Sequence, residues 1–162
     1  MKIVFLDFDG VLNSHEYARS DRYVEKDGIF GLDPQAVARL NRITSRPDVQ
    51  VVVSSYWRLG RTVEQLRDIL DGVGFVGIVR DKTRDWMRRL DGNVFAAEER
   101  GHEIQAWLDE HVKSSDEELE AFVILDDNSD MAHLGSRLIQ TDFELGLQDH
   151  HVDRAIEMLG LS

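Results

Sequence analysis

Short apolar runs alternate with amphipathic segments along the 162 residues of the chain. The runs are rich in β-branched residues and unbroken by polar ones, which is typical of strands buried on both faces of a sheet. Because apolar and polar residues do not alternate within them, the runs favour a parallel sheet over an antiparallel one. They predict strands at residues 3–6, 49–53, 75–79, 122–125 and 138–140.

Helical patterns lie between the expected strands. Asp33 followed by Pro34 predicts a helix start, since aspartate caps the first turn and proline fits the first helical position. Thr62 and Gln65 form a capping-box pattern ahead of a second amphipathic segment. Apolar residues at helical spacing predict two further helices, around residues 104–112 and 152–159.

Strands that alternate with helices predict a Rossmann-like α/β fold, an open parallel sheet with helices on both faces, in one domain over residues 1–162. Two polar segments interrupt the alternation, and neither is long enough to form a domain of its own. We expect residues 13–32 to form a flap or hairpin over one end of the sheet. Residues 80–100 form a basic insert, in which five cations fall within ten positions: Arg80, Lys82, Arg84, Arg88 and Arg89.

The composition restricts the chemistry and the partners. The chain has 19 Lys and Arg against 31 Asp and Glu, and its net charge of −12 argues against binding nucleic acid through bulk charge, although it permits a local basic site. The absence of cysteine excludes disulfides and thiolate metal sites. Asp7 and Asp9 interrupt the first apolar run before it could act as a signal peptide or membrane span. We therefore expect a soluble, cytoplasmic protein without membrane association.

Acidic and hydroxyl side chains follow three of the expected strands. Asp7 and Asp9 follow the first, Ser54 follows the second, and an acid pair follows the fourth, namely Asp126 and Asp127. Because ligands of open α/β sheets bind beyond the carboxyl ends of the strands, we expect these side chains to share one site. Carboxylates this close together resist joint ionisation, so the pattern favours a bound divalent cation. The alternative for the first pair alone is a polar Asp-Gly turn.

The same residues carry a resemblance to a known family. Residues 7–12 (DFDGVL) resemble the first signature of the haloacid dehalogenase-like (HAD) phosphatase superfamily, Ser54 fits its second motif, and the Asp126-Asp127 pair fits its fourth. Longer segments are similar to small stand-alone HAD domains related to those of bacterial Swiss army knife RNA-repair proteins: residues 51–58, 100–108 and 123–130. The resemblance covers nearly the whole chain and implies a HAD-like fold with a minimal cap, which consists of the flap alone.

The resemblance implies a Mg²⁺-dependent phosphohydrolase that works through an aspartyl-phosphate intermediate. Asp7 would be the nucleophile, and Asp9 would protonate the leaving oxygen and then deprotonate the attacking water. The side chains of Asp7 and Asp127 would hold Mg²⁺ together with the backbone carbonyl of Asp9. Asp126 is the alternative to Asp127 as a metal ligand. Ser54 would donate a hydrogen bond to a phosphate oxygen.

The third motif departs from the usual form of the superfamily. A lysine is usual there, and none stands at the expected place; Arg100, which opens the helix that carries Trp107, is the best substitute. Arginine keeps the charge and can bind two phosphate oxygens at once. Lys82 and Lys113 are alternatives, and Arg100 could instead be a surface residue. Arg58, just past the second motif, would either bind the substrate phosphate or pair with a surface acid.

The spacing of the motifs leaves little room for a cap, so we expect an open cleft and a phosphorylated substrate. The basic insert, which carries Trp86 for base stacking, and the RNA-repair resemblance together favour the terminal phosphate of a nucleic acid or nucleotide. The alternative is that the insert is a solvated loop whose charge nearby aspartates balance.

Three other functions remain open. A response-regulator receiver also uses clustered acids on a parallel sheet, but it needs a phosphoacceptor after the third strand, where this chain has Arg80. A catalytically silent HAD-like binding or regulatory module is compatible with the missing lysine. A phosphotransferase with the same intermediate would need an acceptor other than water. The sequence predicts no particular oligomeric state.

Overall fold

The computed structural model of the chain describes residues 1–25, 31–84, 87–90, 94–97, 99–114 and 117–161. Within these residues the main sheet has five parallel strands: β1 (Lys2–Leu6), β2 (Val49–Val53), β3 (Ile78–Lys82), β6 (Ala121–Asp126) and β7 (Leu138–Gln140). Their spatial order is β3-β2-β1-β6-β7, with β1 at the centre. Because the strands are parallel, the residues that follow them meet at one edge of the sheet.

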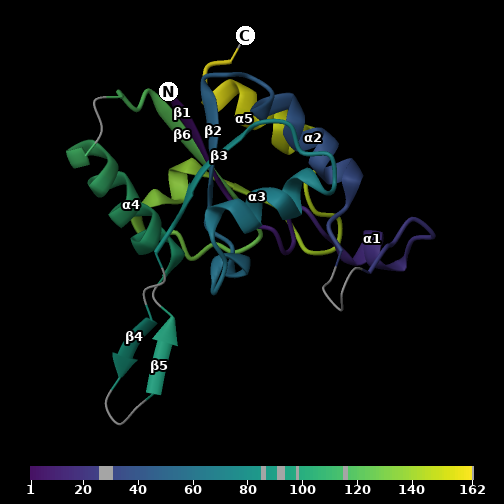
Figure 1. The fold of residues 1–162 in the computed structure, drawn as a ribbon, viewed down its shortest axis with the longest axis horizontal. Helices are drawn as coiled ribbons and strands as arrows, with labels where there is room; N and C mark the ends of the chain where they lie inside the picture. The colour runs from purple at the N-terminus through teal and green to yellow at the C-terminus, as the bar shows by residue number, and fades with distance from the viewer. Residues whose placement is uncertain (26–30, 85–86, 91–93, 98, 115–116, 162) are drawn as a thin grey trace.

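Helices cover both faces of this sheet (Figure 1). On one face, Val4 and Leu6 of β1 enter the larger core, beneath α2 (Pro34–Thr44), α3 (Val63–Asp71) and α5 (Asp149–Met158). On the other face, Ile3 and Phe5 enter a second core, beneath α4 (Arg100–Ser114) and the 3₁₀ helix η2 (Ala132–Arg137). Strands buried on both faces explain the unbroken apolar runs of the sequence. The predicted open parallel sheet with helices on both faces is confirmed.

Two helices begin where the capping residues predict, and a third begins before the first residue of its apolar spacing. Asp33 accepts a hydrogen bond from the backbone N of Gln35 at 2.9 Å at the start of α2. Thr62 and Gln65 make both bonds of the capping box before α3. α4 starts at Arg100, the residue expected to open it, whereas α5 starts with a polar turn that the spacing of apolar residues does not mark. No helix in the described ranges combines the length and the apolar character needed to cross a membrane.

The third strand begins later along the chain than predicted. The apolar run at residues 75–79 predicts a strand, whereas β3 spans Ile78–Lys82. Gly74 and Gly77 have φ angles of 86° and 157°, so the chain turns on either side of Phe75. Phe75 is nevertheless buried in the larger core. The apolar run therefore correctly predicts that Phe75 is buried. The segment that pairs with β2 lies further along the chain and is more polar.

Each of the two polar segments contains secondary structure. The flap segment contains α1 (His15–Arg19), whose first turn Ser14 caps, and residues 26–30 lie outside the described ranges. The basic insert contains an antiparallel pair of strands, β4 (Met87–Leu90) and β5 (Val94–Ala97), which projects away from the main sheet (Figure 1). This hairpin was not predicted from the sequence.

Candidate active site

Polar residues form a row along the carboxyl edge of the main sheet. Leu6 at the end of β1 is in register with Val53 of β2 and Leu125 of β6. The next residue of each strand extends this ladder: Ser54 N donates to Leu6 O at 3.0 Å, and Asp7 N donates to Leu125 O at 2.9 Å. The structure thus brings the three sequence motifs together, with Asp7 between the hydroxyl and the acid pair.

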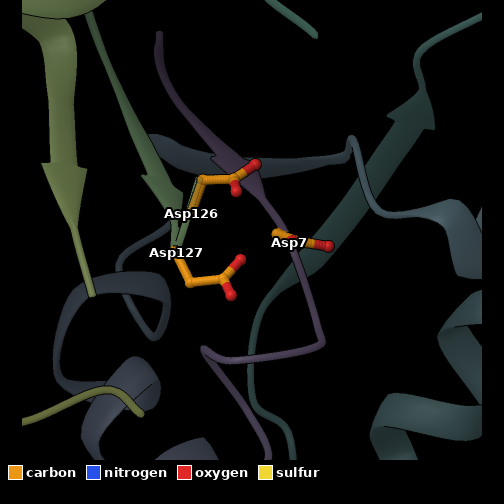
Figure 2. Close-up of side chains that lie close together, drawn as sticks. All are labelled: Asp7, Asp126 and Asp127. Carbon is orange, nitrogen blue, oxygen red and sulfur yellow. The ribbon is translucent and has the colours of Figure 1, made fainter. Parts of the chain in front are cut away.

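Three carboxylates gather at the ends of β1 and β6 (Figure 2). Asp7, Asp126 and Asp127 each offer an oxygen within 4.8 Å of the other two. Burial and the charge of Asp7 raise the pKa of Asp126 to about 7, although Arg100 opposes this shift. The same two causes raise the pKa of Asp127 above its usual range. Hard carboxylate oxygens that repel one another at this spacing fit a small divalent cation such as Mg²⁺.

Gly10 allows the turn after β1 to pack against Asp127. Its φ of 74° is a conformation that side chains disfavour. A Cβ atom at this position would lie only 2.5 Å from Oδ2 of Asp127. Thr141 Oγ1 also donates to the Gly10 carbonyl at 2.6 Å. The glycine of the first motif is therefore required by the closeness of the two acidic segments.

Arg100 is buried against the acid cluster and is only 6% exposed. Its Nη1 lies 3.1 Å from Oδ2 of Asp7 and 2.8 Å from Oδ2 of Asp126. Burial alone would lower the pKa of Arg100, but the charges of Asp7 and Asp126 outweigh it, so the guanidinium stays charged. Lys113 is exposed in the last turn of α4, and Lys82 donates to two backbone carbonyls. Among the three candidate cations, Arg100 contacts the acids.

The loop after β6 fixes the start of α4 and therefore the position of Arg100. Asp130 accepts hydrogen bonds from Arg100 N through Oδ2 at 3.3 Å and from Gly101 N through its carbonyl at 3.1 Å. A Cβ atom at Gly101 would lie 2.1 Å from the Met131 carbonyl oxygen. Only a glycine permits this approach of two backbones. No local pattern predicts this role of Gly101, because a glycine in the first turn of a helix is not unusual.

Two buried hydroxyls continue the row on the other side of Asp7. Ser54 Oγ and Thr83 Oγ1 are inaccessible to solvent and have no hydrogen-bond partner within the described ranges. Thr83 lies beside Ser54, since Thr83 N donates to Val53 O at 3.0 Å. A buried hydroxyl without a partner costs about 1–3 kcal/mol, which a phosphate oxygen at Ser54 would offset. Thr83 was not among the predicted site residues, because the apolar run that predicts the third strand ends at residue 79, before β3 does.

Asp9 is held by two side chains that the sequence analysis did not assign to it. Trp57 Nε1 donates to Asp9 Oδ2 at 3.0 Å, and Asn13 Nδ2 donates to Asp9 Oδ1 at 2.8 Å. The Asn13 Oδ1 in turn accepts from Gly10 N at 2.9 Å. Trp57 comes from the 3₁₀ helix η1 (Tyr56–Arg58), just after β2. Asp9 thus lies between the turn after β1 and the segment after β2.

Arg58 lies in a buried network, which differs from a phosphate-binding position. Its side chain is 1% exposed and donates to Glu103 Oε2 at 2.7 Å. It also donates to four backbone carbonyls, those of Ser54, Ser55, Thr83 and Arg84. Of the two roles considered for Arg58, the structure supports pairing with an acid, although that acid is buried. Arg58 therefore ties the ends of β2 and β3 to α4.

The described cations of the basic insert face acids or carbonyls. Arg80 donates to Glu117 at 2.9 Å, and Arg84 lies 3.2 Å from Glu110. The side chains of Trp86, Arg88 and Arg89 lie outside the described part of the chain. Of the five clustered cations, the three that are described therefore each have an acid or carbonyl partner: Arg80, Lys82 and Arg84.

The chain matches a protein-family model over most of its length. A family model described as the HAD domain in Swiss Army Knife RNA repair proteins matches residues 3–152. This match includes every candidate site residue from Asp7 to Asp127. No curated protein and no solved structure matches the chain significantly.

Replacing Arg58 by alanine should lower the free energy of unfolding by about 3–5 kcal/mol, because it removes the guanidinium from a buried carboxylate. The double variant Arg58→Met, Glu103→Leu removes both charges and should be more stable than Arg58→Ala. Urea unfolding of the three proteins measures both effects. A loss of activity in Arg58→Ala with stability unchanged to within about 0.5 kcal/mol would instead support direct contact with substrate.

Proposed function

The chain belongs to the family of HAD domains in Swiss Army Knife RNA repair proteins, and we propose that it is a Mg²⁺-dependent phosphohydrolase that forms an aspartyl-phosphate on Asp7. One observation carries the proposal. Asp7 lies between a buried hydroxyl, that of Ser54, which has no hydrogen-bond partner among the described residues, and two acids that Arg100 partly neutralises. Phosphoryl transfer needs a nucleophile, a phosphate-binding hydroxyl and a fixed cation around the phosphorus atom.

Asp7 carries out the first step. Its Oδ1 accepts from Phe8 N at 2.8 Å and its Oδ2 faces Arg100, so the carboxylate has a fixed orientation. A bond forms between an Asp7 oxygen and phosphorus while the bond from phosphorus to the leaving oxygen breaks. Asp9 gives its proton to that leaving oxygen, so the product departs as a neutral alcohol. Arg100 and Ser54 stabilise the charge on the phosphoryl oxygens.

Water completes the reaction in the second step. Asp9, now ionised, takes a proton from a water molecule as the water oxygen attacks phosphorus. The bond between phosphorus and Asp7 breaks, inorganic phosphate leaves, and both aspartates return to their starting states. One residue can serve as acid and then base because the second step reverses the proton transfer of the first.

Asp127 is the better candidate of the two rival metal ligands. Asp126 is fully buried and pairs with Arg100 at 2.8 Å, whereas no described cation forms an ion pair with Asp127. Asp127 is only partly buried. Asp7 and Asp127, with the Asp9 carbonyl, would hold Mg²⁺. When bound, Mg²⁺ supplies positive charge that offsets the repulsion among the acids and polarises a phosphoryl oxygen.

The substrate in this proposal is a terminal phosphate of a nucleic acid or nucleotide. The description of the matching family refers to RNA repair proteins. Tyr56 adds a structural argument, because it is 54% exposed and its ring centre lies 5.1 Å from the guanidinium carbon of Arg100. An exposed ring beside the phosphoryl site can stack on a base.

Asp7→Asn should lower the rate of hydrolysis of p-nitrophenyl phosphate in Mg²⁺ by about 10³-fold or more, since the amide cannot form the intermediate. Release of nitrophenolate and of inorganic phosphate should be followed together. Equal release by wild type supports hydrolysis, whereas nitrophenolate in excess of phosphate when an alcohol is added supports a phosphotransferase. No release by the wild-type protein would support the silent binding module.

Mg²⁺ at about 100 times its dissociation constant should raise the melting temperature by about 5–10 °C, because it binds only the folded acid cluster. Asp127→Asn should lose most of this shift. Without Mg²⁺ it should melt no lower than wild type, because it removes one of three repelling charges. Asp153→Asn, an exposed acid on α5, is the matched control and should keep the full shift. An undiminished shift in Asp127→Asn would contradict the assignment.

Tyr56→Ala should raise KM for a nucleoside monophosphate about 10-fold or more, the usual effect of losing a base-stacking ring. Ribose 5-phosphate, which has no base, should show an unchanged KM, and Tyr56→Phe should behave as wild type. Steady-state kinetics with the two substrates provide the comparison. Equal effects on both substrates would count against base stacking.

A further inference from the structure

Both carboxylate oxygens of Asp9 accept hydrogen bonds from neutral side-chain donors. Trp57 Nε1 reaches Oδ2 at 3.0 Å, and Asn13 Nδ2 reaches Oδ1 at 2.8 Å. A carboxylate on a surface turn would otherwise rotate freely. Two donors from different segments of the chain therefore fix its rotamer and the plane of its oxygens.

Contacts with Ser55, Phe8 and Arg61 hold Trp57, whose side chain is partly buried. Its backbone N donates to Ser55 Oγ at 3.3 Å, which caps the short helix η1. Its ring packs edge-to-face on Phe8, with ring centres 5.4 Å apart. Arg61 donates to the Trp57 carbonyl at 3.0 Å and lies over the ring. These contacts fix the orientation of the indole ring, so its N–H points at Asp9.

The chemistry of the two donors limits where Asp9 can carry a proton. An indole N–H can donate but not accept. The Asn13 amide is oriented by Gly10 N, which donates to its oxygen, so its NH₂ group faces Asp9. A proton on Asp9 must therefore sit on a lone pair that faces neither Trp57 nor Asn13. The pair of donors leaves only the remaining lone pairs for exchange with a leaving group or water.

We propose that Trp57 is a positioning residue for proton transfer, which directs the proton of Asp9 toward the leaving oxygen of the substrate. This inference rests on the proposed phosphohydrolase function and assigns a role within it. Trp57 touches neither the phosphorus nor the nucleophile in this scheme. It acts through Asp9, with Asn13 as its counterpart on the second oxygen.

The test compares two leaving groups in the variant Trp57→Phe, which keeps an aromatic ring and removes the N–H. Nitrophenolate leaves as a stable anion and needs no proton, whereas the alcohol of ribose 5-phosphate needs one. kcat/KM reports on the steps up to departure of the leaving group. We expect kcat/KM to fall about 10- to 100-fold for ribose 5-phosphate and less than about threefold for p-nitrophenyl phosphate. A purely structural role would lower both equally.

Trp107→Phe is the matched control. Trp107 likewise packs edge-to-face on a phenylalanine, Phe5, and its Nε1 donates to an aspartate, Asp81, at 2.7 Å. It lies on α4 in the second core, away from Asp9. Its loss should cost comparable stability, measured by thermal unfolding, and should not change the ratio of kcat/KM for the two substrates.

Asn13→Ala provides an independent variant, which should show the same selective loss if Trp57→Phe does not fold. Equal losses for both leaving groups in the variant that folds, or no loss in either, would overturn the positioning role. Failure of the underlying function has a different signature. In that case Asp7→Asn would hydrolyse both substrates as fast as wild type, whatever the Trp57 variant does.

Discussion

Repulsion among three carboxylates at the end of the central strand is the constraint on which the site depends. Asp7, Asp126 and Asp127 offer oxygens within 4.8 Å of one another, and Asp126 is fully buried. Ionised acids this close are stable only when positive charge lies beside them. Arg100 supplies one such charge from α4, and its contacts with Asp7 and Asp126 leave Asp127 for a divalent cation.

Much of the surrounding structure serves to hold these charges in place. Gly10 lets the turn after β1 approach Asp127, and Gly101 lets the start of α4 approach the loop after β6. The buried pair of Arg58 and Glu103 joins the ends of β2 and β3 to α4, one helical turn beyond Arg100. Backbone packing and the buried ion pair thus fix the segments that carry the acids and Arg100.

The sequence predicted those parts of the fold and site that depend on local pattern. Unbroken apolar runs located four of the strands, and the capping residues Asp33 and Thr62 located two helix starts. The acids and Ser54 were found because polar residues at strand ends stand out against apolar runs. Burial without pairing explains the error at the third strand, where Phe75 fills the core ahead of β3.

The rest depends on contacts between distant segments, which no local pattern records. A buried arginine and a phosphate-binding arginine look alike in sequence, and only the position of Glu103 on α4 distinguishes them for Arg58. The indole of Trp57 reaches Asp9 from 48 positions away in the chain. The hairpin of β4 and β5 was missed because each strand has only four residues and β4 carries two arginines.

The central claim is that Asp7 attacks phosphorus, and the variant Asp9→Asn tests it most directly. With p-nitrophenyl phosphate, formation of the intermediate needs no acid, whereas its hydrolysis needs the base that this variant lacks. Rapid mixing should release about one equivalent of nitrophenolate per protein in a burst. Mass spectrometry should then find the phosphoryl group on Asp7. Steady release of nitrophenolate and phosphate without a burst, or a phosphoryl group on another residue, would contradict the account.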